Sequence, residues 1–396
     1  MKNVLSAAVA AAVLCSAGAN AAVSQSDIDT LKAQMAEMAA RLNALEHENH
    51  KLREKAAQHK AHGKKHTAGA SWTDNIKLKG DLRYRYENID KEGSDTRNRN
   101  RVRARAQLVA KLPSDVEVGI GVASGSADPA SSNQTLGGGA TSKDLNLDLA
   151  YFKWNINEQF NLTGGKYKSQ WFKPQKSSLI YDGDLRPEGF ALGFDNGNLF
   201  ANVEANWIES DSKKGDELAY SAQLGFKAGV VTAAVGYINI PVKGSAPLYK
   251  GDFYGNSSVN GVYAYDYELA NVAINADLVV RGLPFAVYAD FVQNQDAGSY
   301  DTGYIVGAKL GKAKHPGTWQ LQYQYQDLEA DAVLGVWTDS DFAGGDTDGK
   351  GHKLSGKYAL AKQWTVGLTY LINEVGVDLG GSKDYDRVQV DTVFKF

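Results

Sequence analysis

The sequence predicts an all-β transmembrane protein, a 16-stranded antiparallel barrel that follows an N-terminal coiled-coil helix. Three observations predict the barrel. From Trp72 onward the chain consists of short runs in which apolar and polar residues alternate with a period of two, as in strands with one apolar and one polar face. Short and long connections between these runs alternate, as in membrane barrels. The last ten residues, RVQVDTVFKF, form another such run and end on Phe396.

The composition fits one large β structure. The 396 residues include 41 Gly and 20 Tyr but only 8 Pro, and the net charge of −3 gives no reason to expect nucleic-acid binding. No stretch beyond the N-terminus reaches the ~18 apolar residues of a membrane helix. The motifs G-x-S-x-G and H-E-x-x-H are absent, and five of the seven histidines lie between His47 and His66. The sequence therefore predicts neither an enzyme nor a cofactor.

Residues 1–21 have the pattern of a secretory signal peptide. Lys2 supplies the basic start, residues 4–14 are apolar, and the small residues at 19–21 form a cleavage site after Ala21. Cleavage there removes Cys15, the only cysteine, so we expect no disulfide and no cysteine metal site in the mature chain.

Residues 22–55 predict a coiled coil. Asn49 at a seam position favours a dimer, whereas the run RLNALE at 41–46 resembles a motif of parallel trimers. A single helix packed on its own domain is the other alternative; we expect self-association into a homotrimer. The seam positions, at alternating spacings of three and four, are Ile28, Leu31, Met35, Met38, Leu42, Leu45, Asn49 and Leu52.

Residues 56–71 are a basic, histidine-rich linker. His59, His62 and His66 invite a metal-site interpretation, but no carboxylate or fixed scaffold accompanies them. We therefore expect a solvated, pH-sensitive linker and no bound metal.

Residues 72–396 are expected to form the barrel. The even number of strands places both barrel ends on the periplasmic side, with the long loops outside. The last strand must pair with the first, because an open sheet edge in lipid leaves backbone groups without hydrogen bonds. The expected strands are 76–87, 98–112, 116–125, 144–154, 160–170, 189–195, 199–209, 217–227, 230–240, 268–280, 285–294, 303–313, 318–328, 352–360, 364–374 and 386–396.

The first two strands carry an unusual row of basic residues on their inward face. Antiparallel pairing brings Arg83 and Arg85 close to Arg103 and Arg105, and like charges opposite one another are unfavourable unless water, counter-charges or anions lie in front of them. The row either lines a permeation path or is the solvated wall of a wide barrel. The expected pore-lining residues are Lys77, Lys79, Arg83, Arg85, Arg99, Arg101, Arg103, Arg105, Lys166, Lys168, Asp182, Asp184 and Glu188.

Two long connections bear on the pore. The loop 171–188 carries Asp182, Asp184 and Glu188; it either folds inward opposite the arginines or stays outside as a surface loop. The acidic connection 329–351 contains GGDTDGKG, which is close to a phosphate-binding loop, but Gly351 replaces the required Ser or Thr. We expect this connection to be a flexible outer loop that could bind divalent ions at the cell surface without a fixed geometry.

Several segments, together with the signal, the heptads and the terminal Phe396, resemble the putative porins of Gram-negative bacteria, which are related in pattern to general and phosphate-selective trimeric porins. These segments are KLKGDLRYRYE, NRNRVRARAQL, YDGDLRPEGFAL and LPFAVYADFVQN. The resemblance implies an outer-membrane barrel, in contact with lipid, that passes small hydrophilic solutes by diffusion. The arginine row adds an expected mild preference for anions. The alternative is a barrel anchor whose coiled coil tethers the outer membrane to a periplasmic partner or the cell wall.

Overall fold

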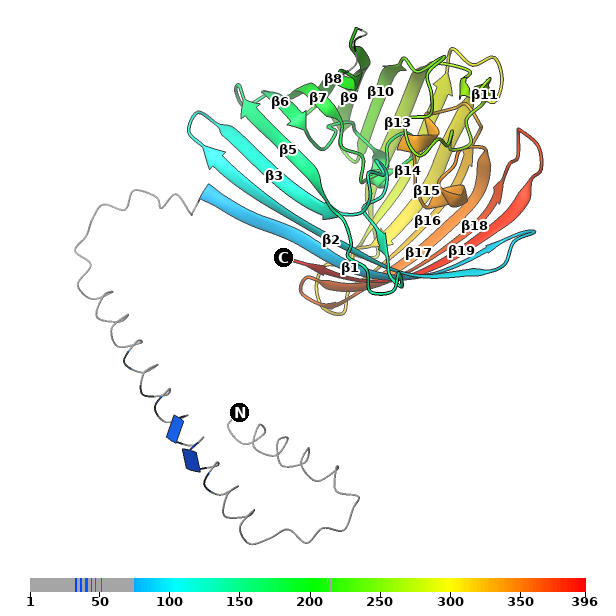
Figure 1. Cartoon of the computed structure of the whole chain (residues 1–396). Helices are drawn as coiled ribbons and strands as arrows, with labels where there is room; N and C mark the ends of the chain where they lie inside the picture. Colours follow the sequence, from blue (N-terminus) through cyan, green and yellow to red (C-terminus); the bar gives the residue numbers. More distant parts are fainter. Residues whose placement is uncertain are drawn as a thin grey trace. The chain divides into compact units, whose positions relative to one another are not determined.

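The computed structural model describes residues 75–211, 213 and 215–396, together with eight helical positions between 33 and 51. The described part of the compact unit 72–396 is a closed antiparallel barrel (Figure 1). The sixteen long strands of the wall are β1 (Ile76–Lys91), β2 (Arg97–Leu112), β3 (Val116–Ser124), β5 (Leu145–Asn155), β6 (Phe160–Lys166), β7 (Glu188–Asp195), β8 (Leu199–Glu209), β9 (Glu217–Ala228), β10 (Val231–Ile240), β13 (Tyr267–Val280), β14 (Leu283–Asn294), β15 (Thr302–Gly311), β16 (Trp319–Leu328), β17 (Gly349–Ala361), β18 (Trp364–Val375) and β19 (Lys383–Lys395).

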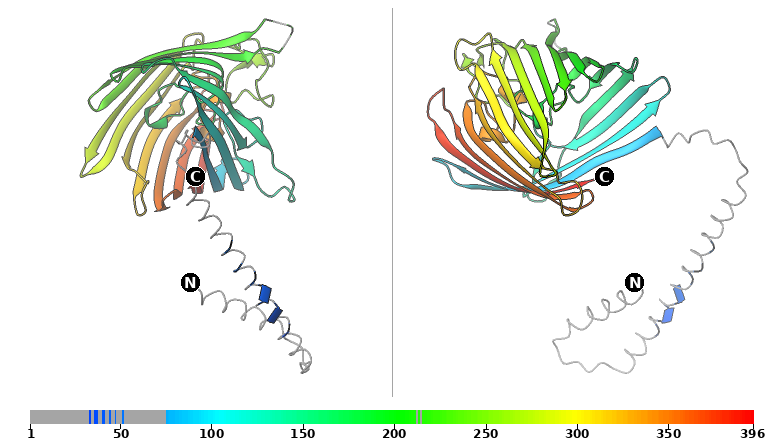
Figure 2. Two further views of the ribbon diagram at one scale, coloured as in Figure 1. Left: turned by 90° about the vertical axis from the view of Figure 1, so that its left-hand side faces the viewer. Right: turned by 180° about the vertical axis from the view of Figure 1, so that it is seen from behind.

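Each long strand pairs with the next one along the chain, and β19 closes the barrel against β1 (Figure 2). The closing register runs from Asp81 opposite Lys395 to Lys91 opposite Tyr385. Beyond it, Gly80 and Phe396 exchange two backbone hydrogen bonds of 3.0 and 3.1 Å. The Phe396 ring covers Gly80, where a Cβ atom would lie 2.3 Å from the ring. The predicted 16-stranded closure is confirmed.

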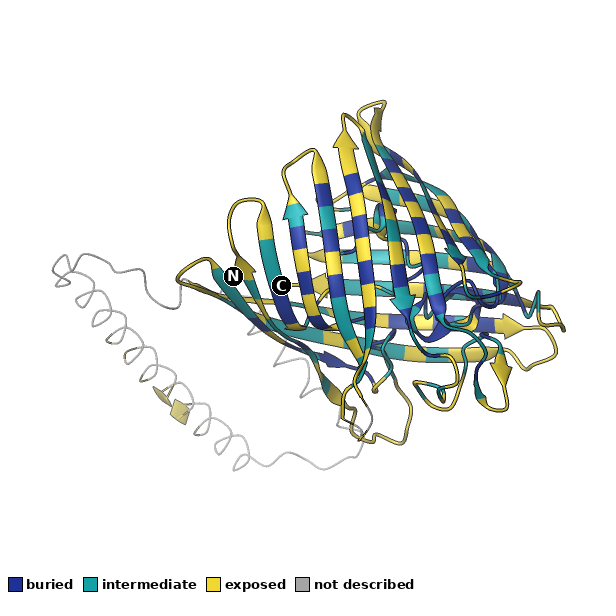
Figure 3. Cartoon of the chain, turned by 90° about the horizontal axis from the view of Figure 1, so that it is seen from above, coloured by how far each residue is buried: buried dark blue, intermediate teal, exposed yellow. Residues whose placement is uncertain are grey.

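The strands alternate between an apolar outer face and a polar inner face. Figure 3 shows exposed and buried residues alternating along them. In β16 the exposed Leu321 and Tyr323 point outward, while Gln322 and Gln324 point inward. The outer face offers lipid a continuous apolar surface, and the polar side chains are kept inside, as barrel membrane proteins require. Among the described residues, no helix has the length and hydropathy of a transmembrane helix.

The connections follow the predicted alternation only in part. We name the loops L1 to L8; they span 92–96, 125–144, 167–187, 210–216, 241–266, 295–301, 329–348 and 376–382. The turn 312–318 on the opposite side is as long as L4, so the alternation is not strict. L2 contains β4 (Gln134–Thr135), which pairs with β2 beyond the end of β3, and L5 contains the hairpin of β11 (Ser258–Val259) and β12 (Val262–Tyr263).

Many strand ends differ from the prediction by one to three residues, and two differ by four. β1 continues to Lys91 because backbone pairing with β2 and β19 persists after the apolar pattern ends. β6 stops at Lys166, four residues early, because the chain turns inward there. The Ser169 hydroxyl and the Gln170 amide both donate to Glu204 inside the barrel, at 2.9 and 3.0 Å, and this contact replaces strand pairing.

The long loops L3, L5 and L7 fold together into a shared core. Buried residues of L3 (Leu179, Tyr181), L5 (Tyr263) and L7 (Val333, Leu334) belong to one apolar cluster. L3 contains η2 (Pro174–Lys176), and L7 contains η3 (Gly335–Trp337) and η4 (Phe342–Gly344). The prediction that 329–351 is a flexible outer loop is wrong, because the apolar residues between its aspartates bury L7 against L3 and L5.

The predicted signal peptide, the coiled-coil seam and the linker histidines lie outside the described residues. The eight described positions between 33 and 51 are helical and exposed. Among them, Arg41 pairs with Glu37 one turn earlier, at 2.9 Å. Self-association through this segment stays a prediction.

Candidate functional site

The inward arginines of β1 and β2 lie opposite one another. Pairing places Arg83 opposite Arg103 and Arg85 opposite Arg101. The Arg85 residue is only 5% exposed. Four guanidinium groups therefore share a small area of wall, and this arrangement depends on counter-charges nearby.

The wall supplies three of these counter-charges itself. Asp81 lies between Arg103 and Arg105, at 2.8 and 2.7 Å. Glu87 pairs with Arg99 and with Arg387 of β19, both at 2.7 Å. Because Asp81 and Glu87 flank the two inward arginines of β1, the barrel closes around a network of paired charges.

β19 supplies a third wall carboxylate that sequence reasoning missed. Asp391 accepts from Arg85 at 2.7 Å, and both Asp391 and Arg387 lie on the inner face of β19. The run RVQVD gave the signal, since Arg387 and Asp391 occupy the same face four residues apart. Only the register of β19 on β1 shows that Arg387 meets Glu87.

L7 contributes a carboxylate to the same network. Asp341 accepts from Arg85 at 2.7 Å and from Arg387 at 2.8 Å. Burial alone would raise the pKa of Asp341, but Arg387 and Arg85 hold it well below its usual range. Asp339, two residues earlier in L7, pairs with Lys353 of β17 at 2.8 Å. These ion pairs fix L7 to the barrel wall from the inside.

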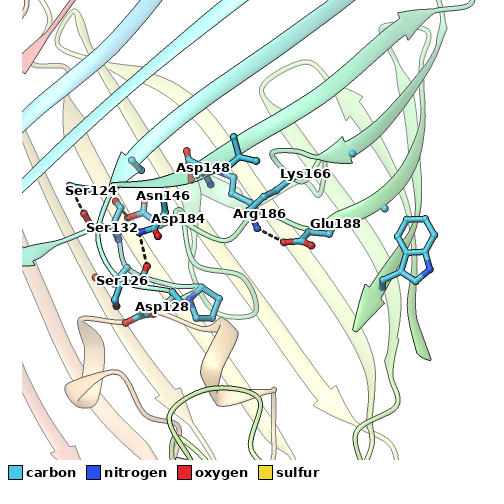
Figure 4. A pocket seen from close by; sticks show the side chains of 18 residues that line it. Ser124, Ser126, Asp128, Ser132, Asn146, Asp148, Lys166, Asp184, Arg186 and Glu188 are labelled. Carbon is cyan, nitrogen blue, oxygen red and sulfur yellow. Dashed lines mark hydrogen bonds and ion pairs between the residues drawn. The ribbon is translucent and has the colours of Figure 1, made fainter. Parts of the chain in front are cut away.

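L2 and L3 meet the arginines at the other end of the row. Asp184 of L3 accepts from Arg105 at 2.7 Å and from the Ser132 hydroxyl of L2 at 2.6 Å. Despite burial, Arg105 and Arg103 keep the pKa of Asp184 below its usual value. Asn133 of L2 accepts from Arg83. Figure 4 shows Ser132 and Asp184 on a cavity of about 770 Å³ bounded by L2, L3 and the strands β5 to β8.

Asp182 does not face the arginines. One carboxylate oxygen accepts the backbone N–H of Asp184 at 2.6 Å, and the other accepts that of Ser340 in L7 at 3.3 Å. Burial and the nearby Asp339 raise the pKa of Asp182 to about 8. The side chain therefore connects L3 to L7 instead of opposing the basic wall.

Lys166 and Glu188 pair with each other and line the same cavity as Ser132 and Asp184 (Figure 4). On β7, Glu188 lies on the opposite face to Ala191 and Gly193. Gly193 is on the inner face, because it lies against Gln170 of the inward loop L3. The outward Phe190 shares the face of Glu188. The place of Lys166 and Glu188 in the pore stays a prediction.

Two of the predicted basic residues line a smaller space beside the arginines. Lys79 and Lys168 line a cavity of about 170 Å³ together with Asp81 and Arg105. Lys77 lies near the start of β1, where it is exposed. Among the residues that the structure describes, no group of three or more His, Asp or Glu side chains is arranged to hold a metal ion. The L7 aspartates 339 and 341 are engaged by basic side chains, which leaves them unsuited to surface cations.

Comparisons with known proteins agree on the fold. OprB of Pseudomonas putida, in a high-pH structure, matches with a TM-score of 0.59 at 13% identity, over 82% of this chain and 95% of that one. OmpF of Salmonella typhi, in complex with daunomycin, matches with a TM-score of 0.51 at 13% identity, over 82% and 99%. A search of curated proteins found no significant match. Residues 90–270 and 256–396 match the family described as putative porin, and the chain belongs to that family.

Proposed function

We propose that the protein forms a water-filled channel for passive diffusion of small hydrophilic solutes across the outer membrane. The observation that best supports this proposal is a closed barrel with an apolar outer face and a row of charged side chains inside. The family and the fold point to a channel in the outer membrane and not to an enzyme. Charged side chains are costly to bury without water, so their number inside the barrel favours an aqueous lumen.

The loops set the width of the proposed path. L3 crosses the barrel from β6: its Gln175 donates to Asn275 of β13 at 2.8 Å, and Lys309 of β15 donates to Gln175 at 3.0 Å. L7 lies on L3, and Thr338 donates to the carbonyl of Leu179 at 2.8 Å. We propose that solutes pass through the space that these two loops leave beside the wall, which restricts the path to small molecules.

We further propose a mild preference for anions. Within the described part of the chain, the network holds seven guanidinium groups against five carboxylates, which leaves a formal positive excess of two. The guanidinium groups are those of Arg83, Arg85, Arg99, Arg101, Arg103, Arg105 and Arg387, and the carboxylates are those of Asp81, Glu87, Asp184, Asp341 and Asp391. In ~0.1 M salt, screening acts over ~10 Å, so this excess affects permeation chiefly where the passage is narrow. The candidate pore-lining set for this preference is Lys77, Lys79, Arg83, Arg99, Arg101, Arg103, Arg105 and Lys168.

A homotrimer is proposed as the working assembly. It rests on the heptad pattern of residues 22–55 and on the family. The alternative function, a barrel anchor with a tethering coiled coil, depends on a segment that lies mostly outside the described residues. An anchor does not require a charged interior, and no described contact favours it.

A liposome-swelling assay tests the proposal. Proteoliposomes of the full chain should swell in isotonic solutions of small neutral sugars, and faster with a small anionic solute than with a cationic one of similar size. Heat-denatured protein provides the control. Swelling that never exceeds that of the control would contradict a diffusion channel, and equal rates for the anionic and cationic solutes would remove the anion preference alone.

A further inference from the structure

Three lysines from separate elements come together inside the barrel. Lys176 lies at the tip of L3, Lys309 on β15 and Lys357 on β17. Lys309 donates to Gln175, the neighbour of Lys176, at 3.0 Å. Lys309 lies opposite Gln322 of β16, and Lys357 lies opposite Gln320, two residues along the same strand. These two lysines are therefore two strands and two residues apart, about 12 Å between their Cα atoms. The charge of Lys176 acts on both Lys309 and Lys357, and that of Lys309 acts on Lys357.

The three lysines lack the counter-charges that the arginines have. Among the described residues, none of the three forms an ion pair, whereas the neighbouring Lys353 pairs with Asp339 at 2.8 Å. Two carboxylates act on them electrostatically, Asp277 on Lys309 and Asp391 on Lys357, but both have other hydrogen-bond partners. Asp391 pairs with Arg85 at 2.7 Å, and Asp277 accepts from Asn275 at 2.8 Å and from Gln175 at 3.2 Å.

The tip of L3 is held in place despite this repulsion. Gln175 bridges two wall strands through Asn275 and Lys309. Gln175 and Lys176 both have positive φ, 45° and 67°, a conformation that costs free energy in residues other than glycine. The fold therefore keeps three ammonium groups close together and accessible, with neutral glutamine and serine side chains between the strands.

We infer that Lys176, Lys309 and Lys357 form a binding subsite for small doubly charged anions. An ion of charge −2 is attracted electrostatically by all three ammonium groups. Chloride, with a single charge, gains half as much electrostatic energy from each of them. Lysine presents a compact charge without the planar fork of arginine, so the subsite accepts phosphate and dicarboxylates alike. This inference rests on the proposed channel and gives it a substrate class.

Single-channel recording of the full chain in dilute KCl tests the subsite. Inorganic phosphate and succinate should each block the chloride current in a concentration-dependent manner. The triple variant K176Q/K309Q/K357Q should weaken both blocks by about tenfold or more, because three nearby charges are lost. The charge-matched control is K111Q/K153Q/K395Q, which removes three lysines near the periplasmic strand ends and should leave both blocks within about twofold of the unmodified protein.

The outcomes separate this inference from the proposed function. Open channels with no block by either anion, or with the same block in the triple variant, overturn the subsite but keep the channel. Block by phosphate without block by succinate overturns the assigned ligand class. A chain that folds, as judged by heat-modifiable migration on gels, yet never conducts overturns the channel itself.

Discussion

At the scale of single residues, the interior is governed by carboxylates that are shared between arginines. Asp341 touches Arg85 and Arg387, and Arg387 is only 1% exposed. Burying such charges is favourable only while each keeps its partners. Asp341 therefore neutralises part of the positive charge of the wall arginines and fixes L7 to the wall.

Replacing this carboxylate tests that role. Asp341→Asn should lower the free energy of unfolding by about 1–3 kcal/mol, because Arg85 keeps Asp391 and Glu87 as partners and Arg387 keeps Glu87. The zero-current potential in a salt gradient should also shift in the direction of stronger anion preference. Thermal unfolding in detergent and bilayer recording measure the two effects. Asp211→Asn, at an exposed L4 position, is the control and should stay within about 0.5 kcal/mol. Unchanged stability and selectivity would show that the Asp341 contacts contribute nothing.

Because of Asp182, we expect the stability of the fold to depend on pH with the opposite sign to that given by an ion-paired carboxylate. Its pKa of about 8 in the folded chain lies above the ordinary value of 3.8. The folded state then holds more protons than the unfolded state between these values, so stability falls as pH rises through that window. The contribution of Asp182 should make the unfolding temperature decline from pH 5 to about pH 8 and should level off above it, and Asp182→Asn should flatten the decline within that range. A decline of the same slope in the variant would contradict the assignment.

Sequence reasoning predicted the inward arginines and offered Asp184 as a loop partner, which pairs with Arg105, but it did not predict Asp341. A one-residue slip would have turned every arginine toward lipid, so the period of two was sufficient to assign the face. Arg85 and Asp341 are 256 residues apart in the chain, and no local pattern links them.

At the scale of elements, the strands were predictable and the loops were not. The predicted strand 199–209 matches β8, because strand periodicity is a local property of the chain. L7 was misread because its apolar residues, such as Leu334, are interrupted by aspartates and glycines. Its fold depends on side chains of L5: Asn256 donates to the carbonyl of Val333 at 2.8 Å and accepts from the amide of Gly335 at 2.8 Å.

Substitutions that detach L7 from this apolar core should expose the loop to protease. Val333→Ser and Leu334→Ser together place hydroxyl groups in an apolar cluster, which is unfavourable without partners. L7 of the variant should become sensitive to proteinase K added to intact cells, and single-channel conductance should rise. The unmodified chain should resist cleavage within 329–348. Cleavage of the unmodified L7 under the same conditions would contradict its inward packing.

At the scale of the whole molecule, closure depends on the last residue. Phe396 exchanges backbone hydrogen bonds with Gly80, and its ring covers that glycine. The terminal strand was predicted from its alternation and from the rule that a barrel in lipid has no free edge. The path inside the barrel could not be predicted, since it depends on how three loops pack against each other.

Deleting Phe396 should therefore slow or reduce assembly. The variant loses the final backbone bonds of the closing strand and exposes Gly80. The heat-modifiable, folded fraction on gels should fall relative to the unmodified chain. Phe396→Tyr keeps the ring and the backbone and should assemble normally. Normal assembly of the deletion variant would show that closure is complete without Phe396.

Single-channel recording under a salt gradient tests the central claim most directly. The purified full chain in a planar bilayer, with KCl more concentrated on one side, should give discrete conductance steps and a zero-current potential of the sign expected for chloride preference. The potential should shrink as salt is raised, because screening weakens the field of the arginine and lysine side chains. Folded protein that inserts without any conductance steps would contradict the account.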